Sequence, residues 1–117
     1  MFPRNVNKFP KEKVAAGVKT TKQVLISTGE APNFAMRKFS IEPGGSMPLH
    51  INKVEHEQYV LNGSAEVRIG NEKFIVKKDD VVFIPAQTPH SYKTIGSDAF
   101  EFLCVVPNEE DEITLYE

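Results

Sequence analysis

The sequence has little of what would place the protein in a membrane or outside the cell. It contains one cysteine, Cys104, in 117 residues, so no disulfide can form within the chain, as is usual in a reducing compartment. Its apolar runs are short, as Val81 to Ile84 and Phe102 to Val106 illustrate, whereas a membrane-spanning helix needs about 18 residues. Residues 1–13 carry charges and prolines where a secretory signal needs an apolar stretch. These absences predict a cytoplasmic protein with no membrane partner.

The sequence also lacks a strong excess of either charge, although its two ends are oppositely charged. The net charge of −2 is too balanced for a protein that binds a polyanion. In residues 1–22, six Lys or Arg and one Glu give +5, and in residues 98–117 seven acids give −7. These ends are interpreted either as solvated segments or as segments that pair across a dimer. Aromatic residues do not alternate with the positive charges, so no nucleic-acid partner is predicted.

No stretch of twelve or more residues has a helical period. After Val24 the chain instead alternates short β-branched or aromatic segments with turn residues. Asn62-Gly63 and Gly70-Asn71 are sequences typical of two-residue hairpin turns. A weak helical turn is expected at residues 10–18. The predicted strands cover residues 24–27, 34–41, 49–52, 57–61, 64–69, 73–77, 81–84, 90–95 and 100–106, with a short extra strand at 113–116.

So many strands in a short chain predict an all-β fold, an antiparallel barrel of about ten strands. The whole chain, residues 1–117, is expected to form a single domain. Its core is predicted over about residues 24–107, with an N-terminal arm at 1–22 and a C-terminal tail at 108–117.

Alternation along the predicted strands indicates which side chains share the barrel interior. The inward residues that carry chemistry are Arg37, Phe39, His50, Asn52, His56, Gln58, His90, Phe102 and Cys104. The run from Val81 to Ile84 is apolar on both faces. Its outer face should therefore be covered by a second sheet or by another subunit, and a homodimer is expected.

The three histidines of the chain occur in two motifs. The first is Gly45-x4-His50-x-Asn52-x3-His56-x6-Gly63 and the second is Pro85-x-Gln87-x2-His90. This arrangement resembles the cupin family, whose first motif is Gly-x5-His-x-His-x3-4-Glu-x6-Gly and whose second is Gly-x5-Pro-x-Gly-x2-His-x3-Asn. The resemblance covers roughly residues 34–106. It implies the fold of that family, an antiparallel double-stranded β-helix, also called a jelly-roll barrel.

The departures from the family motifs bear on the ligand set. Asn52 occupies the position of the second His, and His56 occupies the position of the Glu. A His in that position is similar to a subgroup of small bacterial and archaeal cupins that bind a metal with four His. The resemblance implies one divalent transition metal ion, with Fe or Mn favoured and Zn, Ni or Cu as alternatives. Its ligands would be His50, Asn52, His56 and His90.

Imidazoles from neighbouring strands that converge inside a barrel suit a transition metal independently of the resemblance. Asn52 would either offer its carbonyl oxygen to the ion or hydrogen-bond a water bound to the ion. With no carboxylate ligand, such a site keeps a formal charge of +2 and favours anionic ligands. An inward Arg37 would add to this attraction.

Five residues are predicted to form a substrate pocket: Arg37, Phe39, Gln58, Phe102 and Cys104. Arg37, Phe102 and Cys104 also have a purely structural interpretation. Arg37 either faces a ligand or forms an ion pair at the barrel rim. Cys104 and Phe102 most simply pack the core, because a buried free cysteine behaves as a small hydrophobe. Gln58 is expected to support His56.

Three functions fit these residues. The first is a mononuclear, metal-dependent, oxygenase-type enzyme that acts on a small molecule. The second is a non-catalytic module that binds a small carboxylate or sugar, which the replacement at Asn52 slightly favours. The third is a metal-free domain with a structural role. No acid or base in the sequence fixes a reaction, and the fold alone assigns none.

Overall fold

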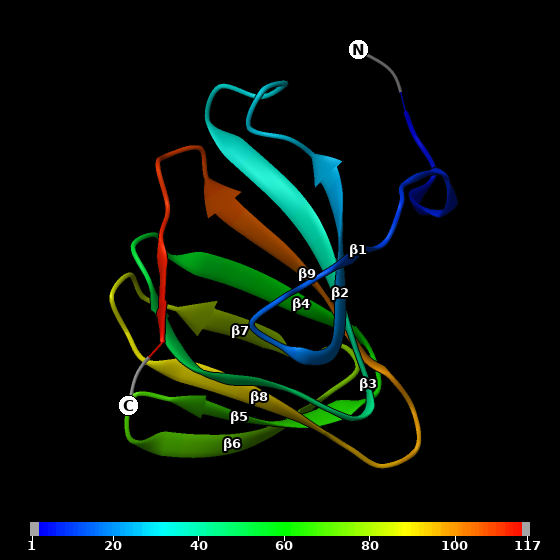
Figure 1. Cartoon of the computed structure of the whole chain (residues 1–117), viewed down its shortest axis with the longest axis vertical. Helices are drawn as coiled ribbons and strands as arrows, with labels where there is room; N and C mark the ends of the chain where they lie inside the picture. The colour runs from blue at the N-terminus through cyan, green and yellow to red at the C-terminus, as the bar shows by residue number, and fades with distance from the viewer. Residues whose placement is uncertain (1–2, 116–117) are drawn as a thin grey trace.

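The computed structural model describes residues 3–115, and strands make up most of it (Figure 1). A short 3-10 helix, η1 (Val6–Lys8), comes first. The strands that follow are β1 (Glu12–Lys13), β2 (Val18–Ile26), β3 (Phe34–Asn52), β4 (His56–Asn62), β5 (Ser64–Ile69), β6 (Glu72–Lys77), β7 (Val81–Ile84), β8 (His90–Ile95), β9 (Phe100–Pro107) and β10 (Ile113–Leu115). No helix in residues 3–115 is of a length and apolarity that would cross a bilayer.

The strands form one curled sheet whose neighbours are far apart in the sequence. Its central order is β6-β5-β8-β3-β9-β4-β7, and β2 and β10 both pair with β3. All of these pairings are antiparallel. The sheet closes around an interior in Figure 1. The predicted all-β fold, an antiparallel jelly-roll barrel, is confirmed.

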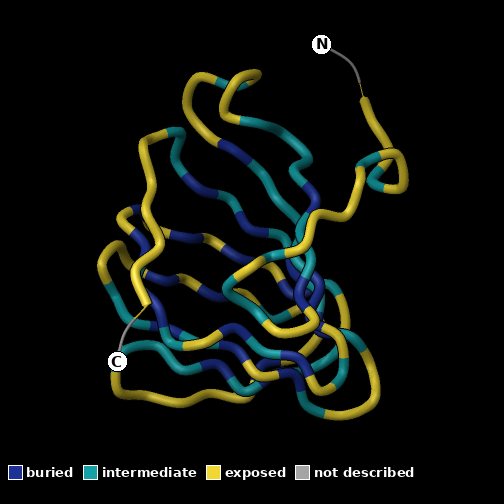
Figure 2. The backbone as a smooth tube through the Cα atoms, viewed as in Figure 1, coloured by how far each residue is buried: buried dark blue, intermediate teal, exposed yellow. Residues whose placement is uncertain are grey.

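Burial alternates along β4, β7, β8 and β9, so each of these strands turns one face to the interior (Figure 2). On β4, His56, Gln58 and Val60 are buried while Glu57 and Tyr59 are exposed. The same alternation runs along β9, where every second residue from Phe100 is buried. The buried apolar side chains form one cluster: Ala35, Ile41, Met47, Val54, Val60, Ala65, Val67, Val76, Val82, Ile84, Tyr92, Phe100, Phe102, Cys104 and Val106.

The 19-residue strand β3 joins the two segments predicted as separate strands, 34–41 and 49–52. Its first half pairs with β2 and β9, and its second half pairs with β8 and β10. A Cβ added at Gly45 would lie 2.7 Å from the carbonyl oxygen of Val18, so glycine lets β2 approach here. One strand thereby carries Arg37 and His50 into the same interior.

The helical turn predicted at residues 10–18 is wrong. Residues 12–13 form β1, which pairs with β2, and Val18 already begins β2. Strand pairing with Thr21 and Lys22 fixes this segment as extended, an interaction that local propensity does not include. The 3-10 helix lies earlier in the chain, where the side chain of Asn5 accepts a hydrogen bond from the N–H of Asn7 (2.9 Å).

The two turn predictions have different outcomes. Gly70 has a positive φ, and the β5–β6 hairpin pairs Ile69 with Glu72, so this hairpin is confirmed. Gly63 also has a positive φ, but it closes no hairpin. The strands on either side of it separate, because β4 pairs with β7 and β9 whereas β5 pairs with β6 and β8. A turn sequence fixes the bend of the chain and not the partner of each strand.

The first and last segments of the described residues each pack against a strand of the same chain. Gln23 on β2 donates through Nε2 to the carbonyl oxygens of Val6 and Phe9, each at 3.0 Å. The predicted strand at 113–116 is present as β10, which lies beside residues 50–52 of β3. The last residue predicted for that strand, 116, is outside the described residues.

The strand β7 is apolar on both faces, as its sequence predicts. Val82 and Ile84 are buried, whereas Val81 is 75% and Phe83 57% exposed. Tyr59 and the half-buried Leu103 lie with them along a shallow hollow on the outside of the barrel. The subunit expected to cover this face stays a prediction.

Candidate metal centre and pocket

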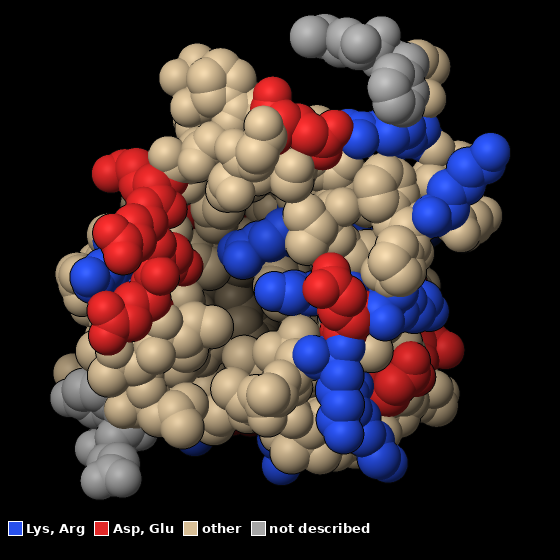
Figure 3. Space-filling model, turned by 45° about the horizontal axis from the view of Figure 1, so that its top comes forward, with Lys and Arg blue, Asp and Glu red and all other residues tan. Residues whose placement is uncertain are grey.

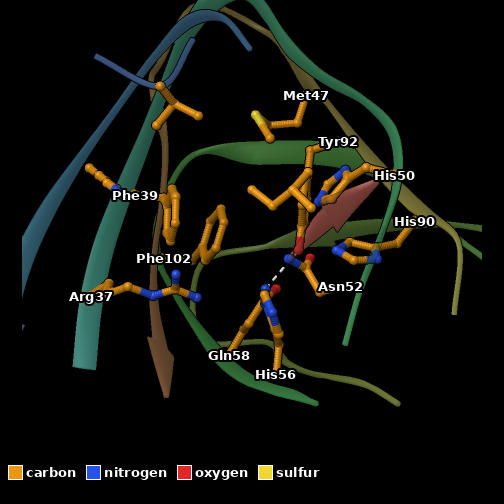
Figure 4. A pocket seen from close by; sticks show the side chains of 13 residues that line it. Arg37, Phe39, Met47, His50, Asn52, His56, Gln58, His90, Tyr92 and Phe102 are labelled. Carbon is orange, nitrogen blue, oxygen red and sulfur yellow. Dashed lines mark hydrogen bonds between the residues drawn. The ribbon is translucent and has the colours of Figure 1, made fainter. Parts of the chain in front are cut away.

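A hollow opens into the barrel interior, and the space between its lining atoms is about 490 Å³, part of it open to solvent. Figure 4 shows the side chains that line it, and Figure 3 shows a hollowed face of the molecule with a group of Asp and Glu on one side of the hollow and, on the other, Lys and Arg together with further acidic side chains. Its lining residues are Val14, Lys22, Arg37, Phe39, Met47, His50, Asn52, His56, Gln58, His90, Tyr92, Phe102 and Ile113.

Two of the histidines are fixed by the backbone in the same way. His50 Nδ1 lies 2.7 Å from the carbonyl oxygen of Pro48, and His90 Nδ1 lies 2.9 Å from that of Thr88. A carbonyl oxygen only accepts, so Nδ1 carries the proton in each ring and Nε2 keeps its lone pair. This is the arrangement of metal-ligating histidines, whose second nitrogen is held by a carbonyl or a carboxylate.

The third histidine, His56, has a different neighbour. Its Nδ1 lies 3.3 Å from the sulfur of Cys104. Its Nε2 is buried and has no hydrogen-bond partner, and the same is true of His90 Nε2. A buried polar nitrogen with no partner among the described residues is costly whether it donates or accepts, so both nitrogens indicate a missing group in the hollow.

The side chain of Asn52 is oriented by the C-terminal tail. Its Nδ2 donates to the carboxylate of Asp111 at 3.1 Å, and the same carboxylate accepts the backbone N–H of Lys53 at 2.9 Å. Because a carboxylate only accepts, this contact fixes which end of the amide faces Asp111. The opposite atom, Asn52 Oδ1, is buried and has no hydrogen-bond partner. An acceptor oxygen is thereby left beside the imidazoles.

Burial keeps the imidazoles neutral. It lowers the pKa of His56 to about 3, with a further lowering by the positive charge of Arg37 and by the other two histidines. Burial also lowers the pKa of His90 to about 4, and it lowers that of His50. Neutral imidazoles are the form that binds a metal, so no proton has to leave at neutral pH.

Buried imidazole nitrogens and an amide oxygen are atoms that can bind a divalent transition metal ion. The ring centroids of His50 and His90 are 4.1 Å apart, and those of His56 and His90 are 5.7 Å apart. As the side chains stand, no three His, Cys, Asp or Glu residues in 3–115 are grouped to hold an ion. Those four residue types do not include asparagine, so the amide oxygen of Asn52 is an additional possible ligand. The buried nitrogen and oxygen atoms that have no partner among residues 3–115 carry more weight here, because leaving a buried polar atom unsatisfied has a lasting cost.

The predicted pocket residues fall into two groups. Arg37, Phe39, Gln58 and Phe102 line the hollow with the four predicted ligands. Cys104 lies behind the lining, fully buried, with Arg37 Nη2 at 3.5 Å and Gln58 Nε2 at 3.8 Å from its sulfur. Burial raises the pKa of its thiol, so the sulfur stays protonated.

Other lining residues were missed from the sequence: Val14, Lys22, Met47, Tyr92 and Ile113. Parity offers a signal for Tyr92, which is two residues from His90 on β8, and its hydroxyl accepts a hydrogen bond from Gln58 Nε2 (2.7 Å). The sequence offered no signal for Lys22 and Val14, because the first strand was expected to begin at residue 24 instead of Val18. Ile113 enters the lining through the pairing of β10 with β3.

An antiparallel jelly-roll barrel with histidines gathered inside an open hollow defines a class of small β-barrel proteins. The chain belongs to the cupin family, because the cupin-domain model of that family matches residues 37–106, which contain all three histidines.

The chain is similar to proteins of several activities. It is 32% identical over 92 residues to 1-methylthio-D-xylulose 5-phosphate methylsulfurylase of Rhodospirillum rubrum, covering 79% of this chain and 58% of the relative. It is 38% identical over 68 residues to quercetin 2,3-dioxygenase of Bacillus subtilis, covering 57% of this chain and 20% of the relative. The chain therefore spans little more than half of the one and a fifth of the other.

Among solved structures, the chain is similar to the polyketide cyclase RemF of Streptomyces resistomycificus. The TM-score is 0.88 at 29% sequence identity, over 100% of this chain and 87% of that one. Relatives with three different activities share the barrel, so the fold by itself selects no reaction.

Proposed function

We propose that this cupin binds one divalent transition metal ion and acts on a small molecule as a mononuclear, oxygenase-type enzyme. One observation carries the proposal. Two buried imidazole nitrogens, on His56 and His90, and the buried amide oxygen of Asn52 lack partners on the wall of one hollow. His50 joins them with its Nδ1 held by Pro48.

The ligands would be His50, Asn52, His56 and His90. A bound ion would supply Lewis-acid chemistry, and Fe or Mn would add redox chemistry. The carbonyls of Pro48 and Thr88 hold two of the rings, and Asp111 holds the amide, so the donors are oriented before any ligand arrives. We favour Fe or Mn from the family resemblance, with Zn, Ni or Cu as alternatives.

The rest of the lining orients a substrate and excludes water. Phe39 and Phe102 form an apolar wall, and Gln58 donates a hydrogen bond to the hydroxyl of Tyr92 (2.7 Å). Burial raises the pKa of Tyr92, so its hydroxyl keeps its proton and is a donor instead of a base. Among residues 3–115 no Asp or Glu lines the hollow, so none of their carboxylates is placed there to remove a proton.

The lack of Asp and Glu among the described lining residues also favours a second function, a module that binds a small molecule without converting it. A pocket without a carboxylate base suits capture as well as oxidation, and an amide in place of one imidazole weakens the ligand set.

Elemental analysis of protein purified without chelator or affinity tag tests the metal. We expect close to one equivalent of a transition metal in the wild type and almost none in His90→Ala. A wild type that carries no metal and takes up none from Mn²⁺ or Fe²⁺ solution would overturn the proposal. Oxygen uptake with metal-loaded protein and candidate small acids then separates the two functions. Tight ligand binding without oxygen uptake or product would favour the binding module.

We also propose a homodimer in which a second copy covers the outer face of β7. The support is the exposure of Val81 and Phe83 beside Tyr59, because exposed apolar side chains that lie together are typical of interaction sites.

A further inference from the structure

The guanidinium of Arg37 faces the hollow without a charge partner. Among residues 3–115 no carboxylate forms an ion pair with it. Its Nη2 has a contact of 3.5 Å with the sulfur of Cys104, and its Nε is buried with no hydrogen-bond partner. A guanidinium presents several donors in a fixed plane that matches a carboxylate. An unused set of donors that faces this hollow therefore indicates an anionic group that is supplied from outside.

A second cation belongs to the same wall. Lys22 on β2 is paired in register with Phe39 on β3, two residues from Arg37, and it lines the same hollow. It too forms no ion pair in the described part of the chain. Among the described residues no Asp or Glu lines the hollow, so two positive charges face it with no carboxylate on its wall.

Beside these cations, aromatic rings form a continuous stack. The guanidinium carbon of Arg37 lies 5.1 Å from the centroid of Phe39, and Phe39 is stacked on Phe102 at 5.3 Å. Phe102 is stacked in turn on Tyr92 at 5.2 Å, and Figure 4 shows it between Phe39 and Tyr92. Phe102 has a stacked ring on either side, so it offers a ligand its edge. Ring edges carry partial positive charge and attract the face of another aromatic ring.

The far side of the hollow limits how much negative charge a ligand should carry. The run from Glu109 to Glu112 is acidic, and Figure 3 shows acidic side chains on one side of the hollowed face. Within this run, Asp111 already accepts from Asn52 and from the N–H of Lys53. These charges repel a dianion more strongly than a monoanion.

We propose that the pocket takes an aromatic monocarboxylate. Its carboxylate pairs with Arg37 and Lys22, its ring lies against the edges of Phe39, Phe102 and Tyr92, and its far end points toward the histidines. The inference names the substrate class for the proposed function and rests on that function for the site. The end of the pocket that holds the carboxylate, at Arg37 and Lys22, needs no metal. Carboxylate binding and metal binding can therefore be tested separately.

The experiment measures binding of benzoate and of benzamide, its neutral counterpart, to metal-free and Mn²⁺-loaded protein by calorimetry or NMR titration. Metal-free wild type should bind benzoate more tightly than benzamide. Arg37→Gln should weaken benzoate binding about 10-fold to 100-fold, the value of a hydrogen bond to a charged group, and leave benzamide unchanged. Arg37→Lys should retain part of the affinity, because lysine keeps the positive charge but lacks the planar pair of donors that binds both carboxylate oxygens. Acetate, which has no ring, should bind more weakly than benzoate.

Lys38→Gln is the matched control, because Lys38 is the next residue on β3 and pairs with Glu101 instead of facing the hollow. It should leave benzoate binding unchanged. If Arg37→Gln does not fold, the comparison of benzoate with benzamide in the wild type still decides.

Each outcome supports or overturns the proposal. Equal binding of benzoate and benzamide, or no benzoate binding tighter than about 1 mM, overturns it. Benzoate binding that needs Mn²⁺ and is indifferent to Arg37→Gln assigns the carboxylate to the ion, which overturns this inference and leaves the proposed function intact. Benzoate binding that depends on Arg37 in a protein that takes up no metal supports this inference and overturns the metal function.

Discussion

The two halves of strand β3 build opposite ends of the pocket and differ in how their polar side chains are satisfied. In the second half, His50 is held by the carbonyl of Pro48, and Asn52 is held by Asp111. In the first half, Arg37 has one long contact to sulfur and a buried Nε without a partner. The comparison shows that the chain orients the imidazole end through its own contacts, whereas the Arg37 end still lacks the charge that would satisfy it.

The largest effect should come from His90→Ala, which removes a donor from the imidazole end only. Metal affinity should fall at least 100-fold, because even loss of a supporting hydrogen bond costs about 10-fold to 100-fold. Benzoate binding by the metal-free protein should persist. Calorimetric titration with Mn²⁺ and with benzoate measures both, and Ser91→Ala, on the neighbouring position of β8, is the control. A variant that keeps its metal affinity would show that His90 only packs against Tyr92.

Asn52→His should strengthen the imidazole end. A ring at this position can point one nitrogen at the ion and donate from the other to Asp111, so metal affinity should rise about 10-fold or more. The melting temperature at a fixed metal concentration should rise with it, because the ion binds only the folded chain. Unchanged affinity in the titration would place Asn52 Oδ1 away from the ion and leave a site of three histidines completed by water.

Asp111→Ala tests whether the tail orients Asn52. It frees the amide to turn, so metal affinity should fall about 10-fold. Glu112→Ala is the control, because it removes the same charge from the same tail while Glu112 contacts only the exposed ammonium of Lys53 (3.3 Å). If the two substitutions lower the affinity equally, the effect is one of overall charge, and the hydrogen bond to Asn52 contributes nothing measurable.

The two ends should also differ in their response to acid, since imidazoles titrate and a guanidinium does not. The folded pKa values of about 3 for His56 and about 4 for His90 lie below the unfolded value of about 6.5. Below about pH 6.5 the unfolded chain therefore binds more protons, and the free energy of unfolding of the metal-free protein falls as the pH drops. Each of these imidazoles contributes about 1.4 kcal/mol per pH unit.

Urea denaturation of metal-free protein at several pH values between about 4.5 and 6.5 measures this dependence. His56→Gln should make it shallower by the contribution of one group. A wild-type stability that does not change over this range would show that the imidazoles are more accessible to protons than their burial indicates.

The apolar outer face of β7 contains no residue of β3. A substitution on this outer face should therefore leave both ends of the pocket unchanged. Phe83→Lys should weaken self-association by placing a charge in the proposed interface. Sedimentation equilibrium measures the mass, and benzoate and Mn²⁺ titrations serve as controls. A wild type that sediments as a monomer at micromolar concentration would overturn the homodimer.

The sequence predicted the imidazole end better than the other end, for a physical reason. The motif keeps His50, Asn52 and His56 within seven positions, and the carbonyls that hold His50 and His90 come from the residue two places before each ring. Alternation on strands then suffices to turn these side chains inward. Arg37 and Phe39 were found by the same alternation, because their strand was predicted correctly at residues 34–41.

The rest of the pocket depends on pairings that join distant segments. Lys22 enters through the register of β2 with β3, and Ile113 and Asp111 enter through the docking of the tail on β3. Neither register has a local signal in the sequence. Lys22, Ile113 and Asp111 were missed because long-range strand pairing places them. The hairpin predicted at Gly63 failed for the same reason, since both flanking strands pair with other strands.

The docking of β10 on β3 has a consequence for the behaviour of the protein at high concentration. The backbone of residues 50–52 would otherwise present free N–H and C=O groups along a sheet edge, a template for another chain. β10 covers it with three residues, of which Ile113 and Leu115 are more than half exposed. The new edge is short and follows the acidic run from Glu109 to Glu112, whose like charges repel a second copy. The tail thereby protects the barrel against strand-to-strand aggregation.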